Sequence, residues 1–493
     1  MSVKDQMSFP LESHRLCHWV LATPLVLLPF QFEGSTPWFS SIVAGFFFIG
    51  LAALLWLDPT LFRGGLKGKW VWPVICLLIF PFLQALPIPV SWIEVLSPHR
   101  AEWLHSAENV LGAPFSVASI SYDPLRTAMG GFFWLFLAAY AWLFQLLVRD
   151  ERRLDWLWKL FFAFMGLEAL YGLLQVIIPD LGVQWSPVYS DYHRGSARGT
   201  FTYKNNYAGL LGMVWPVLLA HTLSLGELAR DERGMTSKDE FIRKKSRLRV
   251  FQRQIFLSSI LGLIFLALVF SQSRAGFLCA VIAMAVFWNI GKFHREGILR
   301  LFAVIMVVIL SFGWIVGVGS ILKRYEVIDI SAYGRLDLWR DTMPIVRDHP
   351  LTGTGLNLYN KAIMAYHHNT SIDILEERLK DWRHAHNDYL ELLADLGIPL
   401  ATGIFILIWG YWWWAAKRVW IWETKDKSSK LMDRRTGTNE TSEQDKWNDI
   451  RRLLALGALA GSAAFLCHSW VDWNWQSPAN QVYFVVLLVL MRI

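Results

Sequence analysis

The chain has 493 residues, of which 54% are hydrophobic and 18% are charged. Soluble globular proteins carry about 25% charged residues, so this composition excludes an ordinary soluble protein. The formal net charge is +7. The basic residues stand where membrane topology would place them, so the charge gives no reason to expect a nucleic-acid partner.

Apolar runs of roughly 17 to 25 residues recur along the chain, the length that a helix needs to cross a hydrocarbon core of about 30 Å. The runs lack the period-two alternation of a membrane β-barrel, and backbone groups in lipid must be satisfied within the segment. The expected fold class is therefore all-α, a polytopic membrane protein. Twelve spans are predicted, near residues 17–33, 38–57, 70–90, 127–147, 156–178, 205–224, 254–271, 276–292, 300–322, 396–416, 451–470 and 478–492.

The distribution of lysine and arginine predicts the orientation, because short cytoplasmic loops carry an excess of both. Basic residues fill every second connection: Arg63 to Lys69, Arg149 to Arg153, Arg230 to Arg253, Lys292 to Arg300 and Lys417 to Arg452. The alternate connections, at 91–126, 179–204, 271–275, 323–395 and 471–477, then lie outside. Both termini are predicted to be cytoplasmic.

This topology divides the chain into three parts. Residues 1–322 carry spans one to nine, residues 323–395 form one large outer loop, and residues 396–493 carry spans ten to twelve. A connection at 417–450 is charged and poor in apolar residues. We expect it to be a solvated, partly disordered cytoplasmic linker.

One carboxyl and one amine fall within the fifth span. Glu168 lies near its middle and Lys159 near its cytoplasmic end. An intramembrane carboxyl is a candidate functional group by default. The interpretation favoured here is structural: Lys159 extends its amine to the membrane surface, and Glu168 makes hydrogen bonds between helices.

Two arginines stand at predicted outer ends of spans. Arg198 opens the sequence RGTFTYKNN before the sixth span, which includes Lys204 and Asn206, and Arg274 lies in SQSRAG between the seventh and eighth spans. Either could simply be a surface cation that orients its span. A guanidinium also binds phosphate oxygens in pairs and keeps its charge when partly dehydrated. Two arginines at one membrane face therefore suit a diphosphate.

The loop at 323–395 is unusual for its polar content. It contains five histidines, His349, His367, His368, His384 and His386. An otherwise apolar membrane protein has no packing reason to collect them, so they indicate chemistry on the outer face.

His386 is the candidate base, because a neutral imidazole can accept a hydroxyl proton at physiological pH. Asp388 or Glu391 could orient the ring or stabilise the imidazolium. A satisfied structural histidine is the plainer alternative. A zinc or manganese site formed by His384, His386 and Asp388 is another, although residues two apart on a helix point in different directions.

A fourth polar motif is also predicted to lie on the outer face of the membrane. The sequence HSWVDWNW contains His468 at the top of the eleventh span, followed by Asp472. Tryptophans at the span ends, including Trp473 and Trp475, are expected to form an interfacial aromatic belt.

These motifs, in this order, resemble the bacterial O-antigen ligase and polymerase superfamily. The matching pieces are Arg198-Gly-Thr-Phe with Asn206, Ser273-Arg274-Ala, Gly334-Arg335 with Trp339, Pro350-Leu-Thr-Gly-Thr-Gly355, and His386-Asn387 with Gly397. The resemblance covers roughly residues 190 to 490. One departure is Leu400, where the family's ligase motif often has a glycine, so ligase and polymerase both stay open.

The resemblance implies a glycosyltransferase of the C-type membrane fold, acting at the periplasmic face of the bacterial inner membrane. The donor would be a glycan on undecaprenyl diphosphate, and the acceptor a lipid A-core sugar for a ligase or a growing glycan for a polymerase. Membrane lipids would be the other partners. No metal or cofactor is implied, and the reaction would invert the anomeric carbon.

The same resemblance gives roles to the candidate residues. His386 would be the catalytic base, and Arg198 and Arg274 would bind the diphosphate. Supporting or substrate-contacting roles are expected for Arg335, Lys204, Asn206, Asn387, Asp388, His468 and Asp472.

Three alternatives remain open. Transfer of the glycan to protein side chains would use the same chemistry. A transporter or channel would place charged residues along the spans and show repeat symmetry, whereas here the polar residues gather at one surface. A non-catalytic membrane assembly partner is the third.

Overall fold

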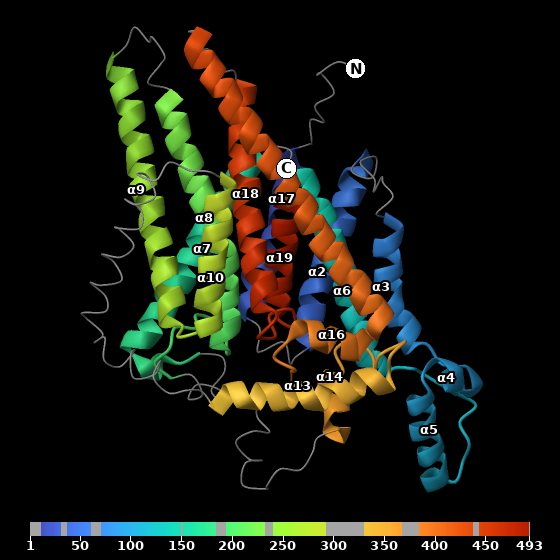
Figure 1. The fold of residues 1–493 in the computed structure, drawn as a ribbon. Coiled ribbons are helices and arrows are strands. Elements are labelled where there is room, and N and C mark those ends of the chain that lie inside the picture. The colour runs from blue at the N-terminus through green and yellow to red at the C-terminus, as the bar shows by residue number, and fades with distance from the viewer. Residues whose placement is uncertain are drawn as a thin grey trace. The chain divides into compact units, whose positions relative to one another are not determined.

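The structure is a computed structural model, and it describes residues 11–30, 37–60, 71–148, 151–183, 194–231, 240–291, 330–366, 384–436 and 443–492. The described residues are mostly helical (Figure 1). Two compact units interleave along the chain. Unit 1 contains Met1–Leu146, Asp329–Ile408 and Ser469–Pro478. Unit 2 contains Leu147–Ile328, Trp409–His468 and Ala479–Ile493.

Eight of the predicted spans are confirmed as helices long and apolar enough to cross a membrane. Within the described ranges these are Trp38–Leu57, Pro124–Leu146, Trp156–Ile177, Lys204–Leu225, Leu248–Phe270, Arg274–Gly291, Ile398–Thr424 and Trp447–His468. The predicted first, third and twelfth spans are shorter apolar helices, Arg15–Phe30, Val74–Ala85 and Pro478–Leu490. The predicted ninth span, at 300–322, lies outside the described residues, so the total of twelve stays a prediction.

Unit 1 begins with the helices α1 (Leu11–Leu27), α2 (Pro37–Leu57), α3 (Val71–Ala85) and α6 (Pro124–Leu147). The hydroxyl of Tyr140 on α6 donates to the carbonyl of Leu21 on α1 at 2.9 Å. Phe47 on α2 meets Phe136 on α6 edge to face, with 5.0 Å between ring centroids. Apolar packing joined by few polar contacts is what buried membrane helices require.

The connection at 91–126 is not an irregular loop. It contains α4 (Val90–Leu96) and α5 (Pro98–Leu111), held against a short antiparallel pair, β1 (Ile88–Pro89) and β2 (Val117–Ala118). Prolines at 87 and 89 explain why α3 stops at Ala85, short of the predicted span end at residue 90. Proline removes a backbone donor and disfavours helical conformation in the residue before it.

The large segment at 323–395 is also helical where the structure describes it. It forms α13 (Ile330–Asp348), α14 (Tyr359–Ala362), a single 3-10 turn η5 (Ile363–Ala365) and α16 (Asp388–Leu396). Within unit 1, α13 lies crosswise to α2, α3 and α6 (Figure 1). Its apolar face, including Leu338 and Ile345, packs into a small core with Tyr359 and Ala394.

The Pro350-Leu-Thr-Gly-Thr-Gly355 motif fastens α13 to the end of α16. Backbone hydrogen bonds run from Thr354 to Ala394 and from Gly355 to Asp395, each at 3.0 Å. Gly353 has a φ of +66°, and a Cβ there would collide with the backbone of Asp395. Glycine is needed at such a left-handed, crowded position. The motif therefore has a structural role in this chain, because it holds the end of α16 in place.

Unit 2 is built around α8 (Lys204–Asp231) and α18 (Glu443–His468), which pack against each other and against α10 (Arg274–Gly291). Unit 2 also contains the long helices α7 (Glu151–Ile177) and α9 (Glu240–Phe270), most of α17 (Ile398–Thr436), and the shorter helix α19 (Pro478–Leu490). On α18, Gly457 and Gly461 lie so close to α8 that a Cβ at either would meet its backbone. This small-residue spacing lets membrane helices approach closely.

The charged connection at 417–450 is helical where the structure describes it, whereas a solvated, partly disordered linker was predicted. α17 continues to Thr436 and α18 begins at Glu443, so only 437–442 lie outside the described residues. Lysine, glutamate and arginine are good helix formers, and they extend a helix beyond the bilayer as readily as they form a linker.

Candidate functional site

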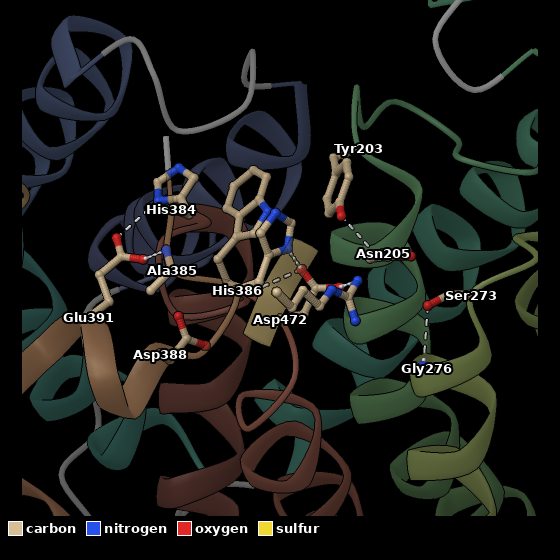
Figure 2. A network of polar contacts seen from close by, with 12 residues as sticks. Tyr203, Asn205, Ser273, Gly276, His384, Ala385, His386, Asp388, Glu391 and Asp472 are labelled. Atoms are coloured by element: carbon tan, nitrogen blue, oxygen red, sulfur yellow. Dashed lines mark hydrogen bonds and ion pairs between the residues drawn. The ribbon is translucent and has the colours of Figure 1, made fainter. Parts of the chain in front are cut away.

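The functional side chains of unit 1 gather around His386. Its Nδ1 lies 3.2 Å from Oδ1 of Asp472, and Figure 2 shows this contact. On the other side of the carboxylate, Oδ2 of Asp472 is 3.7 Å from the guanidinium of Arg335. A histidine, a carboxylate and an arginine from three separate stretches of sequence therefore meet in one place.

The carboxylate in this cluster is completely removed from solvent. Asp472 is 0% exposed, whereas the side chain of Arg335 is 26% exposed. Besides His386 and Arg335, Asp472 accepts a hydrogen bond from the backbone N–H of Trp473 at 3.0 Å. A buried carboxylate that accepts from Nδ1–H fixes the imidazole tautomer and leaves Nε2 as the basic nitrogen.

The backbone presents His386 just before a helix begins. Its φ is +49°, a conformation that non-glycine residues adopt rarely and that costs free energy. The next residue, Asn387, caps α16: its side-chain oxygen accepts from the N–H groups of Tyr389 and Leu390, each at 3.1 Å. Such a cap fixes where the chain enters the helix and so fixes the direction of His386.

The neighbouring His384 has a different carboxylate. Its Nδ1 lies 2.9 Å from Oε1 of Glu391, and its ring stacks on Trp473 with centroids 4.2 Å apart. The second oxygen of Glu391 accepts from the backbone of Ala385 at 2.9 Å. The expectation that Glu391 orients His386 is therefore wrong: Glu391 holds His384. Trp473 is 6% exposed and belongs to this packing, so it is not part of an interfacial belt.

Asp388 holds backbone groups of the loop that follows α18. Its Oδ2 accepts from the N–H of Trp475 at 2.8 Å, and its own N–H donates to the carbonyl of Ser469 at 2.9 Å. The carboxylate that contacts His386 is that of Asp472. Asp472 therefore has the position beside the imidazole that was expected of Asp388. Burial raises the pKa of Asp388 well above its usual range, and the nearby Glu391 adds to the rise.

The metal alternative finds no matching cluster in the described part of the chain, where no three histidine, cysteine or carboxylate side chains are placed to share an ion. The three residues of that hypothesis have separate partners. His384 contacts Glu391, His386 contacts Asp472, and Asp388 accepts from Trp475.

Of the five histidines in the long segment, His349 is structural. It is 1% exposed, and its two ring nitrogens contact the hydroxyls of Ser97 at 3.1 Å and Tyr122 at 2.9 Å. Burial lowers the pKa of His349 to about 4, so the ring is neutral. His367 and His368 lie outside the described residues.

Arg198 belongs to a loop of unit 2 that two polar side chains of α7 hold in place. The carboxylate of Glu168 accepts from the N–H of Thr200 at 3.0 Å and from its hydroxyl at 2.7 Å. Gln175 accepts from the N–H of Arg198 at 3.1 Å and donates to the carbonyl of Gly199 at 2.9 Å. The structural interpretation of Glu168 is confirmed, although its carboxylate holds a loop and not another helix.

The two arginine-bearing segments of unit 2 are neighbours. The N–H of Ala197 donates to the carbonyl of Phe270 at 2.9 Å, which places the residue before Arg198 against the turn before Arg274. Ser273 caps α10, because its hydroxyl accepts from the N–H of Gly276 at 3.2 Å (Figure 2). Arg274 is exposed at the first position of α10, whereas Arg198 is 1% exposed.

The other predicted residues of unit 2 have varied surroundings. Lys204 is the first residue of α8 and is half-buried. Asn206 is 2% exposed, and its carbonyl accepts from the side chain of Asn480 at 3.1 Å. His468 ends α18 and is 1% exposed.

The structure thus brings together two parts of the predicted site, each within its own unit. His386, Asp472 and Arg335 meet in unit 1, and the segments of Arg198 and Arg274 adjoin in unit 2. That these two groups face one substrate stays a prediction. Sequence reasoning missed Gln175, although it stands seven residues after Glu168, a spacing that places two polar groups on one face of an apolar helix.

Comparison with known families agrees with the geometry. Residues 259–408 match the family model described as O-antigen ligase. The match includes Arg274, Arg335 and His386, while Arg198 and Asp472 lie outside it. A search of curated proteins found no match to the chain.

Proposed function

Because the chain carries a domain of the O-antigen ligase and polymerase superfamily, we propose that it is an O-antigen ligase-like glycosyltransferase. It moves a glycan from undecaprenyl diphosphate to an acceptor hydroxyl, with lipid A-core as the acceptor. The observation that carries the proposal is the pairing of His386 with the buried carboxylate of Asp472, within a chain whose long apolar helices suit a multi-pass membrane protein.

His386 acts as the general base. Asp472 accepts from Nδ1–H, so Nε2 is the nitrogen that removes the proton from the acceptor hydroxyl. As the imidazolium forms, the carboxylate of Asp472 stabilises its charge. Arg335 offers this carboxylate a positive charge at 3.7 Å. A base held in this way contributes about 10²- to 10⁴-fold to the rate.

The arginines of unit 2 serve the leaving group. Arg274 is exposed at the start of α10 and binds the diphosphate through its guanidinium, with the partial positive charge of the helix N-terminus behind it. Arg198 supplies a second positive charge from the adjoining loop. Preorganised positive charge aimed at a developing anion is usually the largest catalytic contribution.

The bonds and charges of the reaction balance without another reactant. The acceptor oxygen forms a bond to the anomeric carbon while the carbon–oxygen bond to the diphosphate breaks, and the diphosphate leaves with the electron pair. The hydroxyl proton passes to His386. Attack opposite the leaving group inverts the anomeric configuration, and no metal is needed because arginines stabilise the diphosphate.

The charge distribution of the connections supports a place for this chemistry at the periplasmic face of the inner membrane. Cysteine-scanning with a membrane-impermeant thiol reagent tests that orientation. In whole cells with a permeabilised outer membrane, a cysteine at the exposed Met364 reacts if unit 1 faces the periplasm. The control is a cysteine in the 417–450 segment, which reacts only after lysis.

Surface polysaccharide from a deletion strain separates ligase from polymerase. Lipid A-core without any attached polymer indicates a ligase, as proposed. Core that carries a single repeat unit indicates the polymerase alternative. Unchanged lipopolysaccharide with loss of glycoproteins indicates transfer to protein side chains. Unchanged surface glycans of every kind would contradict the proposal and favour the transporter or assembly-partner alternatives.

A further inference from the structure

The loop Ser469 to Ser477, which follows α18, is fixed to the start of α16 by one residue. The N–H of Asp388 donates to the carbonyl of Ser469 at 2.9 Å, at the beginning of this loop. Its Oδ2 accepts from the N–H of Trp475 at 2.8 Å, near the loop's end. Asp472, the carboxylate that contacts His386, lies between these two attachment points.

Asp388 is buried among other carboxyl groups. It is 2% exposed, Glu391 is 1% exposed and Asp472 is 0% exposed. Three unprotonated carboxylates so close together would repel one another with little solvent to screen them. Burial, together with Glu391 and Asp472, raises the pKa of Asp388 well above its usual range. A neutral carboxyl still accepts the Trp475 hydrogen bond through its carbonyl oxygen.

From this geometry we infer that Asp388 is a positioning residue, which holds the loop Ser469 to Ser477 so that Asp472 reaches His386. It does so as a hydrogen-bond acceptor and not as an anion. The inference rests on the proposed function for its activity readout, but its structural readout is independent of activity. It separates two adjacent residues of one motif: Asn387 caps α16, and Asp388 holds the loop.

The alternative is that the charge of Asp388 takes part in catalysis, as the base or as a ligand of a substrate group. Asp388→Asn distinguishes the two, because the amide oxygen still accepts from Trp475 while the side chain can carry no charge. Asp388→Ala removes the acceptor altogether. Asp472→Asn provides the comparison in which a carboxylate beside His386 is lost.

A matched control lies on the same helix. Asp395 is 0% exposed, and its Oδ2 accepts from the N–H of Asn357 at 2.8 Å. Burial raises its pKa in the same way. The segment that Asp395 holds carries neither Asp472 nor His386, so Asp395→Ala removes a comparable hydrogen bond from a place remote in sequence from the loop.

Hydrogen–deuterium exchange on the full chain in lipid nanodiscs reads the loop directly. Asp388→Ala is expected to speed exchange in the peptide that contains Trp475, whereas Asp388→Asn and Asp395→Ala leave that peptide as protected as in the wild type. Equal protection of this peptide in wild type and Asp388→Ala would overturn the inference, whether or not the protein transfers glycans.

The transfer assay gives the second readout. Asp388→Asn is expected to stay within about threefold of wild-type turnover, while Asp388→Ala loses about 10²-fold, the effect expected when a catalytic group is displaced by about 1 Å. The loss appears in kcat with little change in KM, together with an altered pH profile, because His386 no longer has the carboxylate of Asp472 beside it.

In the transfer assay, two outcomes overturn the inference. One is an Asp388→Asn variant that folds and yet is as inactive as Asp472→Asn, because that would show a need for the charge. The other is an Asp388→Ala variant with wild-type kcat and pH profile. If Asp388→Ala does not fold, Asp388→Asn decides alone. A wild type without transfer activity would count against the proposed function, and the exchange measurement would still test Asp388.

Discussion

The substitution Asp472→Asn removes the charge beside His386 while keeping nearly the same shape. One carboxylate oxygen, Oδ1, lies 3.0 Å from the backbone N of Trp473 and 3.2 Å from Nδ1 of His386, so the oxygen of the amide is expected to keep this place and its nitrogen to replace Oδ2. The tautomer of His386 is then kept, but the imidazolium that forms when Nε2 takes the hydroxyl proton has a neutral amide beside it in place of a carboxylate.

The size of the loss follows from that removal of charge. General base catalysis contributes about 10²- to 10⁴-fold to turnover, and an orienting Asp-to-Asn change in a catalytic triad costs about 10⁴-fold. Asp472 also has Arg335 at 3.7 Å, and that arginine loses its carboxylate partner in the variant. We expect kcat to fall about 10³-fold, with KM for the lipid donor nearly unchanged because the arginines proposed to bind the diphosphate are intact.

The assay is single-turnover transfer from undecaprenyl diphosphate glycan by purified protein. Asp337→Asn is the matched control, since Asp337 is an exposed carboxylate on α13 and its neutralisation is expected to leave kcat unchanged. The reasoning is refuted if Asp472→Asn keeps at least a third of wild-type turnover, or if the loss lies wholly in KM.

Three further predictions test other parts of the account. Burial lowers the pKa of His349 to about 4, so the stabilisation by its neutral ring is complete above pH 6.5, the ordinary pKa of histidine, and is lost as the pH falls toward 4. The unfolding temperature of wild type should therefore fall markedly between pH 7 and pH 4.5, whereas that of His349→Gln should not. Arg274→Lys is expected to raise KM for the donor about tenfold, because a lysine binds phosphate as a point charge and not through two parallel hydrogen bonds; steady-state kinetics check this, and an unchanged KM would argue against direct diphosphate binding. Gly353→Ala should prevent folding or lower the unfolding temperature strongly. Gly112 also has a positive φ, +70°, but a Cβ there would have nothing within 4 Å, so Gly112→Ala should lower the free energy of unfolding by only about 1 to 2 kcal/mol. Similar unfolding temperatures for the two variants would contradict the crowding at Gly353.

Helix class and span positions were predictable because hydrophobic length is a strong local signal. The segments at Trp38–Leu57 and Lys204–Leu225 are apolar over their whole length, and the structure has helices there. The amphipathic helices α4, α5 and α13 carry no such signal. Their apolar faces are defined only by what packs on them, so the sequence predicted loops.

The residues of the candidate cluster could be named from the sequence, but not all of their contacts. His386 and Asp472 were singled out from polar motifs in an apolar chain, and Arg335 from the family resemblance. That Asp472 contacts His386, 86 residues earlier, depends on how the loop after α18 meets the start of α16. Glu391 is nearer in sequence, but it lies one turn into α16 and contacts His384. A hydrogen-bond partner chosen by sequence proximity was therefore wrong.

Contacts that support the site escaped prediction for a related reason. Gln175 was overlooked because a single amide within an apolar run gives no sign of the hydrogen bonds that it makes. The structure gives it hydrogen bonds on both sides of Arg198. On α18, Gly457 and Gly461 formed a readable small-residue motif, yet only the structure shows that α8 is the helix that approaches them.

The most direct test of the central claim is reconstituted transfer with a chemically defined donor. Purified protein in nanodiscs is supplied with undecaprenyl diphosphate glycan and lipid A-core, and both the glycosylated acceptor and the released undecaprenyl diphosphate are measured by mass spectrometry. Equal amounts of the two products are expected from wild type, in the presence of EDTA as well as in its absence. Neither product is expected above background from His386→Ala. Wild-type rates from His386→Ala would contradict that claim, as would release of the lipid without glycosylated acceptor.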